Sequence, residues 1–343
     1  MKKSSSINDF LINQEIGDSS FSVGGVCGRL TVYSYEKPLV ITFSNAGETV
    51  SKNQWLLNKD NIWGYGYIKG MKLNVLSFSC LGKANWYRDA TFHDFLVDLS
   101  DCLKYFPARL GYGGSMGGYA VSAFSNCLGI ERLLLLNPVS TLNKELVPFE
   151  KRFLDAQNLE WDSRFKDGAE TNSTGFVIYD PIFDLDAKHA KRYTALDHYC
   201  LPGVGHQMPI HLKKLNMLKL CFEAFYKNES FDTFFYNKAR DRRGYDRYFK
   251  WMLSGANKHL TTKRRQVIKK HYRMYLAKKD SSLIISRRDV ALLRDQAIFL
   301  YDSGLYRSSL DLLNVLIRIN PNGKEINKYR SLALARMEEK NEL

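Results

Sequence analysis

The sequence predicts an α/β protein, with a mostly parallel sheet flanked by helices, followed by an all-helical, repeat-like C-terminal domain. The sheet is predicted because strand and helix patterns alternate between residues 73 and 193, which is typical of parallel strands joined by helices. The helical domain is predicted because aromatic and aliphatic residues beyond residue 226 recur at helical spacing. We therefore place a sheet domain at residues 1–226 and a helical domain at residues 227–343.

Strand patterns come first along the chain, and helix patterns join them from Phe92 onward. The predicted strands are 29–35, 38–44, 73–79, 110–114, 132–136 and 175–179, and the predicted helices are 92–105, 116–126 and 186–193. The stretch 142–172 is too long for a simple connection. We expect it to form a small cap over the carboxyl edge of the sheet, where the sites of such proteins lie.

Composition excludes several classes of protein. With 45% hydrophobic residues, 25% charged residues and 8 prolines among 343, the chain is neither disordered nor fibrous. No apolar run approaches the ~20 residues of a membrane helix, and polar residues near the start interrupt any signal peptide. We therefore expect a cytoplasmic protein. Its six scattered cysteines form no CxxC pair, which favours neither a zinc site nor a disulfide framework.

A glycine-rich turn that follows a predicted strand and opens a predicted helix carries the clearest chemical signal. Gly113, Ser115 and Gly117 satisfy the pattern G-x-S-x-G. In this context the pattern is typical of a nucleophile elbow, where flanking glycines let a serine occupy a strained turn. The Met116 N–H would then point to the place where negative charge develops on an attacked carbonyl. A dinucleotide-binding turn is excluded, because G-x-G-x-x-G needs glycine where Met116 stands.

A second signal, about ninety residues downstream, is the turn Pro-Gly-Val-Gly-His206-Gln-Met-Pro. Here the sequence resembles the α/β-hydrolase superfamily over residues 21–226, in the elbow, in this histidine turn and in the order serine, acid, histidine. The resemblance implies that Ser115 is the nucleophile. It also implies that His206 is the base, which takes the serine proton during attack and returns it to the leaving group. For the other six histidines a structural role is expected.

The acid must come from the loop after the strand 175–179, which offers carboxylates at positions 180, 184 and 186. The resemblance favours Asp184, with Asp180 as the alternative acid. Asp180 stands before a proline and equally suits a turn, whereas Asp186 suits the N-cap of a helix. The chain lacks the familiar Gly-x-x-Asp form of this loop, so the choice between Asp184 and Asp180 stays open.

The oxyanion hole is also assigned by resemblance. One donor is the Met116 N–H, and the second is expected from the loop after the third strand, at the N–H of Asn45 or Ala46. The His-Gly-Gly-Gly form of this loop is absent, which disfavours a lipase-type subfamily. Trp86 and Tyr87 are candidates for lining the substrate pocket, although large aromatic side chains more often belong to the core.

Together these residues predict a serine hydrolase that cleaves a carboxylic ester or thioester through an acyl-serine intermediate. The substrate would be a small-molecule or carrier-linked acyl compound, and the chemistry requires no metal or organic cofactor. An acyltransferase that passes the acyl group to a glycan or a carrier would use the same triad and is the alternative. A non-catalytic interaction scaffold is a further alternative, which the intact order of serine, acid and histidine disfavours.

Positive charge is concentrated in one segment of the chain. Residues 227–289 hold 18 Lys and Arg against 6 Asp and Glu, out of a net charge of +14. Such a segment focuses a field on an acidic partner, and an anionic glycan or an acyl carrier protein would suit it. Nucleic acid is disfavoured as the partner, because no nucleic-acid-reading motif accompanies the charge. The alternative is a solvated helical face over a buried aromatic stripe.

Residues 291–322 resemble one tetratricopeptide repeat. Ala297 and Ser309 are small where the two helices would touch, Gly304 lies at the turn, and Pro321 closes the second helix. Leu316 departs from the pattern, since a small alanine is usual there. We expect this segment to bind a protein partner and to pack on neighbouring helices, because one repeat is not stable alone. An ordinary helical hairpin is the alternative.

Overall fold

The computed structural model describes residues 7–258, 260–281 and 287–339. The chain divides into two compact units, the first ending at Lys269 and the second beginning at Lys270. The boundary between the two units therefore lies later in the chain than the predicted position after residue 226. Residues such as Phe231, Phe235 and Ala239 share a buried cluster with the sheet, so the segment after residue 226 continues the first unit.

The first unit is built on one eight-stranded sheet, in the order β1-β2-β4-β3-β5-β6-β7-β8. Each neighbouring pair from β4 to β8 is parallel, whereas β2 runs antiparallel to both β1 and β4. The strands are β1 (Gly17–Val23), β2 (Val26–Val32), β3 (Leu39–Phe43), β4 (Asn74–Cys80), β5 (Arg109–Gly114), β6 (Arg132–Pro138), β7 (Thr174–Tyr179) and β8 (Asp197–Cys200).

The helices of this unit are α1 (Ile7–Ile12), α2 (Lys52–Leu56), α3 (Tyr65–Gly70), α4 (Ala90–Cys102), α5 (Ser115–Ala123), α6 (Ser125–Leu128), α7 (Leu154–Gln157), α8 (Asp184–Ala190), α9 (Met208–Lys214), α10 (Leu218–Lys227), α11 (Phe235–Lys238) and α12 (Asp246–Leu253). Short 3-10 turns are η1 (Leu103–Tyr105), η2 (Gly168–Glu170) and η3 (Ala239–Gly244). Helix α13 (Thr262–Ser281) spans the boundary between the units.

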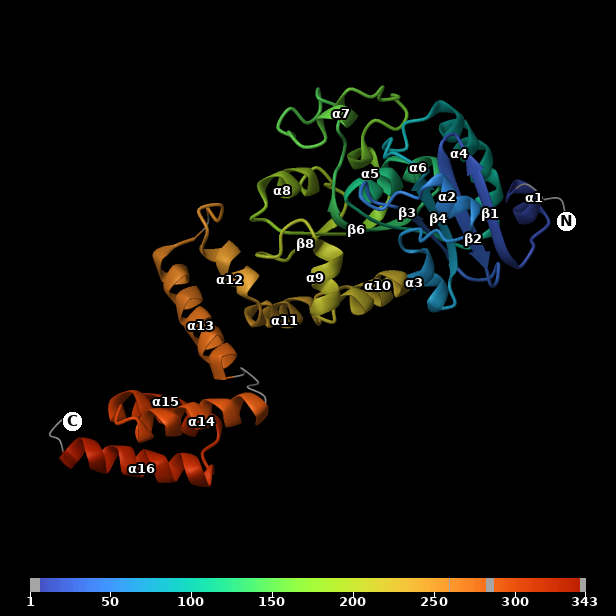
Figure 1. The fold of residues 1–343 in the computed structure, drawn as a ribbon. Helices are drawn as coiled ribbons and strands as arrows, with labels where there is room; N and C mark the ends of the chain where they lie inside the picture. Colours follow the sequence, from blue (N-terminus) through green and yellow to red (C-terminus); the bar gives the residue numbers. More distant parts are fainter. Residues whose placement is uncertain (1–6, 259, 282–286, 340–343) are drawn as a thin grey trace. The chain divides into compact units, whose positions relative to one another are not determined.

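Burial explains how the sheet is covered. Strands β3 and β4 are buried at every position, as expected of parallel strands with helices on both faces, whereas the edge strand β1 alternates between half-buried and exposed residues. Apolar residues of α1, α4, α5, α6 and α8 form one buried cluster with the sheet. Residues of α3, α9, α10 and α11 form a second cluster on the other face, and Figure 1 shows the two layers of helices.

The predicted fold class is therefore confirmed. An eight-stranded, mostly parallel sheet between two layers of helices, followed by an all-helical region, is the α/β-hydrolase fold with a helical extension. The segment 142–172 contains α7 and η2 and supplies Phe153 to the wall of the cavity described below, and its role as a cap stays a prediction.

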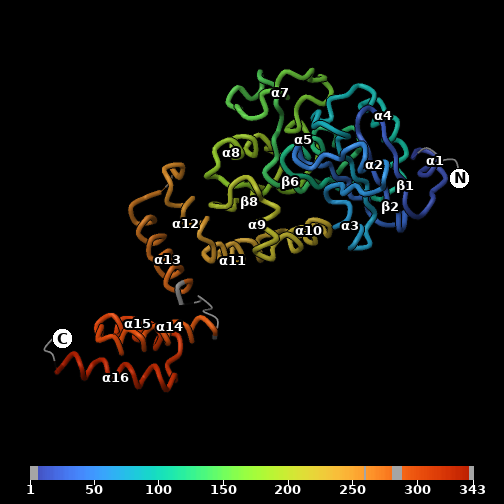
Figure 2. Tube along the Cα trace, in the orientation of Figure 1, coloured from blue at the N-terminus to red at the C-terminus, as the bar shows by residue number. Residues whose placement is uncertain are grey.

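The second unit contains α14 (Arg287–Asp302), α15 (Tyr306–Ile319) and α16 (Lys324–Glu339), which lie side by side in Figure 2. Ser309 Oγ donates to the Ala297 carbonyl at 2.7 Å, so the two small residues meet at the contact between α14 and α15. Gly304, with φ of +78°, forms the turn between them. The helix pair is where the sequence predicts it, and its identity as a tetratricopeptide repeat stays a prediction.

Within residues 7–258, 260–281 and 287–339, no helix combines the length and the apolar character that crossing a bilayer requires.

Candidate active site

Ser115 is the first residue of α5 and follows β5 directly. Its φ of +49° lies in the left-handed region, which costs a residue with a side chain about 1–3 kcal/mol and therefore needs support from its surroundings. That support comes from β6, because the Val139 N–H donates to the Ser115 carbonyl at 3.1 Å and Ser115 bridges to Pro138. The predicted strained turn is present.

The glycines around Ser115 are required by the packing of α5. A Cβ atom on Gly117 would collide with the Phe43 carbonyl at the end of β3. One on Gly113 would lie 2.5 Å from the Gly117 carbonyl oxygen, and one on Gly118 would lie 2.9 Å from Pro138 Cβ. Glycine at these positions thus lets α5 start close against the ends of β3 and β6, which sets where the serine points.

A hydrogen-bonded chain joins Ser115, His206 and a carboxylate. His206 Nε2 lies 3.0 Å from Ser115 Oγ, and His206 Nδ1 lies 2.7 Å from Asp186 Oδ2. Because a carboxylate accepts, Nδ1 carries the proton and Nε2 is left free to accept from the serine hydroxyl. The His206 side chain is 31% exposed and that of Asp186 is fully buried. This is the arrangement that activates a serine for attack on a carbonyl.

The carboxylate is not the one predicted. Asp184 lies on the outer side of α8, where its carboxylate pairs with Lys188 at 2.7 Å, and that hydrogen bond lowers the pKa of Asp184. Asp186 lies in the first turn of the same helix. It is not the N-cap residue, as the sequence suggested, because Phe183 occupies that position. Two helical residues that are two positions apart point to nearly opposite sides. Only one of the two carboxylates therefore reaches His206, and it is Asp186.

Asp180, the alternative acid, has a different role. Its carboxylate is buried and Oδ2 accepts from the N–H groups of Gly203, Val204 and Gly205 at 3.0, 2.8 and 2.6 Å. Burial raises the pKa of Asp180, although these hydrogen bonds oppose the effect. Asp180 thus fixes the backbone of the turn that carries His206. Asn137 completes the support, since its Nδ2 donates to the carbonyls of Gly205 and His206, each at 2.9 Å.

A buried polar network lies behind Asp186. Arg152, from the cap segment, donates from Nη1 to Asp186 Oδ1 at 2.9 Å and from Nη2 to Glu150 Oε2 at 2.7 Å. Glu150 Oε2 also meets His189 Nε2 at 2.9 Å. Burial alone would raise the pKa of Glu150, but its hydrogen bonds with His189 and Arg152 outweigh burial and lower the pKa to about 2. Burial lowers the pKa of His189, which favours its neutral form. Sequence reasoning missed Arg152 and Glu150.

Ser115 and His206 open into a cavity of about 380 Å³. Asn45 and Ala46, the predicted donors of the oxyanion hole, line it together with Glu48, whose pKa is raised by burial. Asn45 Nδ2 donates to Glu48 Oε2 at 2.9 Å, and within the described ranges its buried Oδ1 has no hydrogen-bond partner. Met116 is the second residue of α5, so its N–H lies in the first turn, where a helix offers no internal acceptor. The oxyanion hole stays a prediction.

The aromatic side chains at this cavity differ from those expected. Trp86 and Tyr87 are 2% and 0% exposed and belong to the core, and they do not line the cavity. Trp63 and Phe153 line it instead. Trp63 lies in the connection between α2 and α3, and no local pattern distinguishes it from other tryptophans in the chain.

Two arginines of the basic segment lie near the turn that carries His206. A Cβ atom on Gly205 would lie 3.0 Å from Arg247 Nη2, and Gly203 faces Tyr248 of α12. The Arg242 guanidinium stacks on Tyr248 at 5.3 Å, and within the described residues its buried Nε and Nη1 lack hydrogen-bond partners. Arg242 is therefore partly buried against Tyr248, whereas Arg247 is exposed. An acidic partner for the segment stays a prediction.

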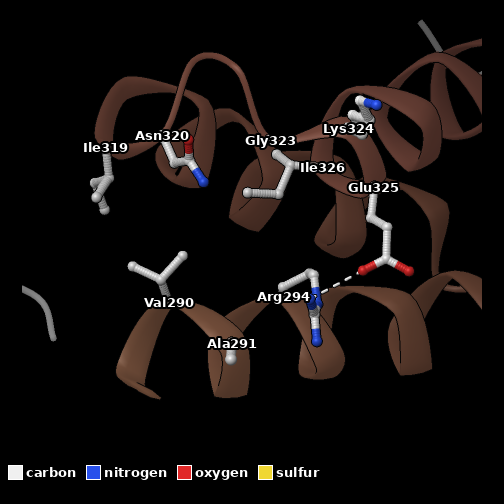
Figure 3. A pocket seen from close by; sticks show the side chains of 9 residues that line it. All are labelled: Val290, Ala291, Arg294, Ile319, Asn320, Gly323, Lys324, Glu325 and Ile326. Carbon is white, nitrogen blue, oxygen red and sulfur yellow. Dashed lines mark ion pairs between the residues drawn. The ribbon is translucent and has the colours of Figure 1, made fainter. Parts of the chain in front are cut away.

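The second unit contains a groove of about 710 Å³, shown in Figure 3. Arg294 and Glu325 form an ion pair across it at 2.9 Å, and Val290 and Ile319 supply apolar walls. Among the described residues that line it, none is a serine, a cysteine or a histidine.

The chain matches no family model and no curated protein. Among solved structures, it is similar to the capsule O-acetyltransferase of Neisseria meningitidis serogroup A, at 11% identity and a TM-score of 0.42, over 61% of this chain and 94% of that one. It is also similar to Est1E from Butyrivibrio proteoclasticus, at 14% identity and a TM-score of 0.39, over 60% and 98% of the two chains. An alpha-beta serine hydrolase homologue from Coxiella burnetii has 10% identity and a TM-score of 0.37, over 62% and 97%. Activity must therefore be argued from the site itself.

Proposed function

We propose that the protein is a serine hydrolase that cleaves carboxylic esters or thioesters through an acyl-serine intermediate. The observation that supports this proposal is the continuous chain from Ser115 Oγ through the His206 ring to the Asp186 carboxylate, at 3.0 and 2.7 Å, opening into a cavity. A scaffold without activity would have no use for a strained serine at the mouth of that cavity.

The reaction follows from the geometry. His206 Nε2 accepts the Ser115 hydroxyl proton while Oγ bonds to the substrate carbonyl carbon, and the carbonyl oxygen becomes an oxyanion beside the Met116 N–H. Asp186 stabilises the imidazolium that forms. His206 then gives the proton to the departing alkoxide or thiolate as its bond to carbon breaks, which leaves an acyl-serine. Water, deprotonated by the same nitrogen, then attacks the acyl carbon. His206 returns the proton to Ser115 Oγ as the bond between Oγ and the acyl carbon breaks, which releases the carboxylic acid and regenerates Ser115.

Transfer of the acyl group to a sugar or carrier hydroxyl passes through the same acyl-serine, with that hydroxyl in place of water. The triad cannot distinguish the two outcomes, so the products decide. With a p-nitrophenyl ester, the proposal predicts a rapid release of p-nitrophenol close to one equivalent per active site if deacylation is the slower step. Adding a carbohydrate acceptor should leave the released acid unchanged for a hydrolase, and should convert it into an acylated sugar for a transferase.

The test of the proposal is whether ester cleavage depends on Ser115. Purified wild-type protein and the variants Ser115→Ala and His206→Ala are compared on the same short acyl ester, and each variant should lose about 10⁴-fold or more in turnover, because triad members act as one unit. Thermal unfolding of each variant serves as the folding control. Equal turnover in wild type and Ser115→Ala would show that any cleavage arises elsewhere, and the proposal would be abandoned.

A further inference from the structure

A second, larger cavity lies next to the catalytic cavity in the first unit. It has a volume of about 580 Å³, within the range of sites that hold small organic ligands. Trp63 and Pro209 line both cavities. The two cavities are therefore neighbours that have these two lining residues in common.

Trp63, the first of the two shared lining residues, is hydrogen-bonded to β3 and to the loop that follows β3. The Trp63 N–H donates to Ser44 Oγ at 3.1 Å, directly before Asn45, and the Trp63 carbonyl accepts from Thr42 Oγ1 at 3.0 Å. The Trp63 ring packs on Tyr112 at 4.7 Å between centroids, and Tyr112 lies in β5 three residues before Ser115. The indole is thus held in place without a ligand, which makes this a preformed wall.

The residue after Trp63 explains how the chain comes so close to the sheet. Gly64 has φ of +81°, and a Cβ atom there would approach the Thr42 side chain to 3.0 Å. Glycine accepts both the backbone conformation and the close approach. The second shared wall, Pro209, is the second residue of α9, which begins two residues after His206. Both walls are therefore continuous with the loops that place the triad.

The lining of the second cavity is chiefly apolar. Tyr67, Tyr112, Leu218 and Leu220 supply aromatic and aliphatic surface in addition to the shared walls. Among the described residues that line it, the charged ones are Lys213 and Lys219, and both are exposed to solvent. A chain of methylene groups or an aryl group gains free energy from entering such a space, whereas the hydroxyls of a sugar ring find few partners there, chiefly Asn216, the two lysines and the Tyr67 hydroxyl.

We propose that this cavity binds the apolar chain of the ester that Ser115 cleaves, so that the protein prefers medium-chain or aryl esters to acetyl esters of small alcohols. The identity of the reaction depends on the proposed function, whereas the affinity for an apolar chain depends on the cavity alone. The apolar chain is part of either the acyl group or the alcohol of the ester. Both would make the same apolar contacts in the cavity.

Two series of substrates separate the sources. In the acyl series, p-nitrophenyl acetate, butanoate, hexanoate and octanoate share one leaving group. In the alcohol series, ethyl, butyl, hexyl and octyl acetate share one acyl group. Each buried methylene is worth about 0.8 kcal/mol, so kcat/KM should rise about threefold to fourfold per methylene in the series whose chain enters the cavity. A flat response in both series would contradict the proposal.

A cavity-filling variant connects the preference to this cavity. Leu218→Trp should lower the ratio of kcat/KM for octanoate over acetate, or for octyl over ethyl acetate, by about tenfold or more, because the added ring occupies the space of several methylenes. Leu220→Trp is the second variant, in case the first unfolds. The matched control is Leu56→Trp, since Leu56 is 76% exposed and lines neither cavity, and it should keep the wild-type ratio. Unchanged ratios in folded Leu218→Trp and Leu220→Trp would overturn the proposal.

A binding measurement distinguishes failure of this inference from failure of the proposed function. Calorimetric titration of the Ser115→Ala protein with octanoate and with octanol requires no turnover. Binding of either ligand that is lost in Ser115→Ala/Leu218→Trp supports the cavity even if no ester is cleaved, in which case the hydrolase proposal alone fails. Ester cleavage without chain-length preference, together with no binding of octanoate or octanol, refutes the cavity and leaves the hydrolase proposal intact.

Discussion

Arg152 Nη1 lies 2.9 Å from Asp186 Oδ1, on the same carboxylate whose other oxygen, Oδ2, lies 2.7 Å from His206 Nδ1. The Asp186 carboxylate, which we propose as the triad acid, is therefore held from both sides, by the imidazole and by a guanidinium from the segment 142–172. Arg152 also stacks on Phe153 at 5.6 Å, and Phe153 lines the catalytic cavity. One arginine thus connects the cap, the cavity wall and the triad.

The first prediction concerns this arginine. Replacing Arg152 with alanine removes a charge-assisted hydrogen bond worth about 1.5–3 kcal/mol, so kcat/KM should fall about 10- to 100-fold. The remaining negative charge of Asp186 then favours the imidazolium form of His206. The acid limb of the pH–rate profile should therefore move to higher pH, which a purely structural defect would not produce. The profiles of wild type and Arg152→Ala on one ester provide the measurement.

Arg192→Ala is the matched control for Arg152→Ala. The side chains of Arg152 and Arg192 are each 22% exposed, and Arg192 pairs with Asp167 at 2.6 Å instead of with Asp186. It should lose stability with its ion pair but keep the wild-type pH–rate profile. If Arg152→Ala keeps that profile too, Arg152 has no electrostatic influence on the triad.

The second prediction separates the three carboxylates of the acid loop. Asp186→Asn should lower turnover about 10⁴-fold while the protein stays folded, because the amide no longer selects the tautomer in which His206 Nε2 accepts. Asp184→Asn should change turnover less than about twofold, since its partner is the exposed Lys188. Turnover of the same ester by both variants is the measurement. A larger loss in Asp184→Asn than in Asp186→Asn would contradict the observed geometry.

Asp180→Asn should behave differently from both. An amide in place of the Asp180 carboxylate keeps one oxygen but loses the charge that three backbone N–H groups share. The free energy of unfolding should fall by about 1–3 kcal/mol, with a loss of turnover that follows from displacement of His206. Urea unfolding, measured beside turnover, distinguishes this role from that of Asp186.

The sequence contained a signal for Asp186, the carboxylate that hydrogen-bonds to His206. Asp184, Lys188 and Lys191 recur at spacings of four and three, which is the pattern of a solvent-facing helix side, and Ala187 and Ala190 mark the opposite side. Asp186 falls with the alanines and is buried. Reading α8 as an amphipathic helix from residue 184 would have excluded Asp184. The family spacing favoured Asp184 because it counts residues along the loop and ignores the direction in which each side chain points.

The third prediction concerns the elbow. Gly117→Ala places a methyl group against the Phe43 carbonyl, which has no flexible end that can move aside, so the free energy of unfolding should fall by about 3 kcal/mol. The control is Gly47→Ala, because a Cβ atom there meets no atom within 4 Å, and its stability should stay within about 0.5 kcal/mol of wild type. Urea unfolding of the two variants checks this. Equal stability of both would mean that α5 does not pack as described.

The elbow was predictable and the network behind Asp186 was not, for a physical reason. Gly113, Ser115 and Gly117 are close in sequence, and the strain that they relieve is local. Arg152 and Glu150 lie more than thirty residues from Asp186 and His189, in a segment without regular pattern, and they meet only through the fold. Trp63 was not predictable for the same reason, because its position at the cavity depends on hydrogen bonds to β3 and Ser44.

The fourth prediction uses the pKa of Glu150, lowered from the ordinary 4.5 to about 2. A carboxyl with a lowered pKa in the folded state stabilises the protein fully above about pH 4.5, and this contribution is lost as the pH falls towards 2. Glu150→Gln should therefore be less stable than wild type by about 1–3 kcal/mol near neutral pH, and the difference should shrink below about pH 4.5. Urea unfolding of both proteins from about pH 6 to about pH 3 measures it. A difference that stays constant over this range would show that the ionised form is not the one held in the network.

Covalent labelling of Ser115 tests most directly whether Ser115, His206 and Asp186 work as a triad. The intact protein is treated with a fluorophosphonate, and its mass and its peptides are measured with the wild-type chain and with Asp186→Asn and Asp184→Asn. A working triad should give one adduct per chain, on the peptide that contains Ser115, formed rapidly by wild type and Asp184→Asn and slowly by Asp186→Asn. No adduct, or an adduct on a residue other than Ser115, would contradict the claim that Ser115, His206 and Asp186 form a working triad.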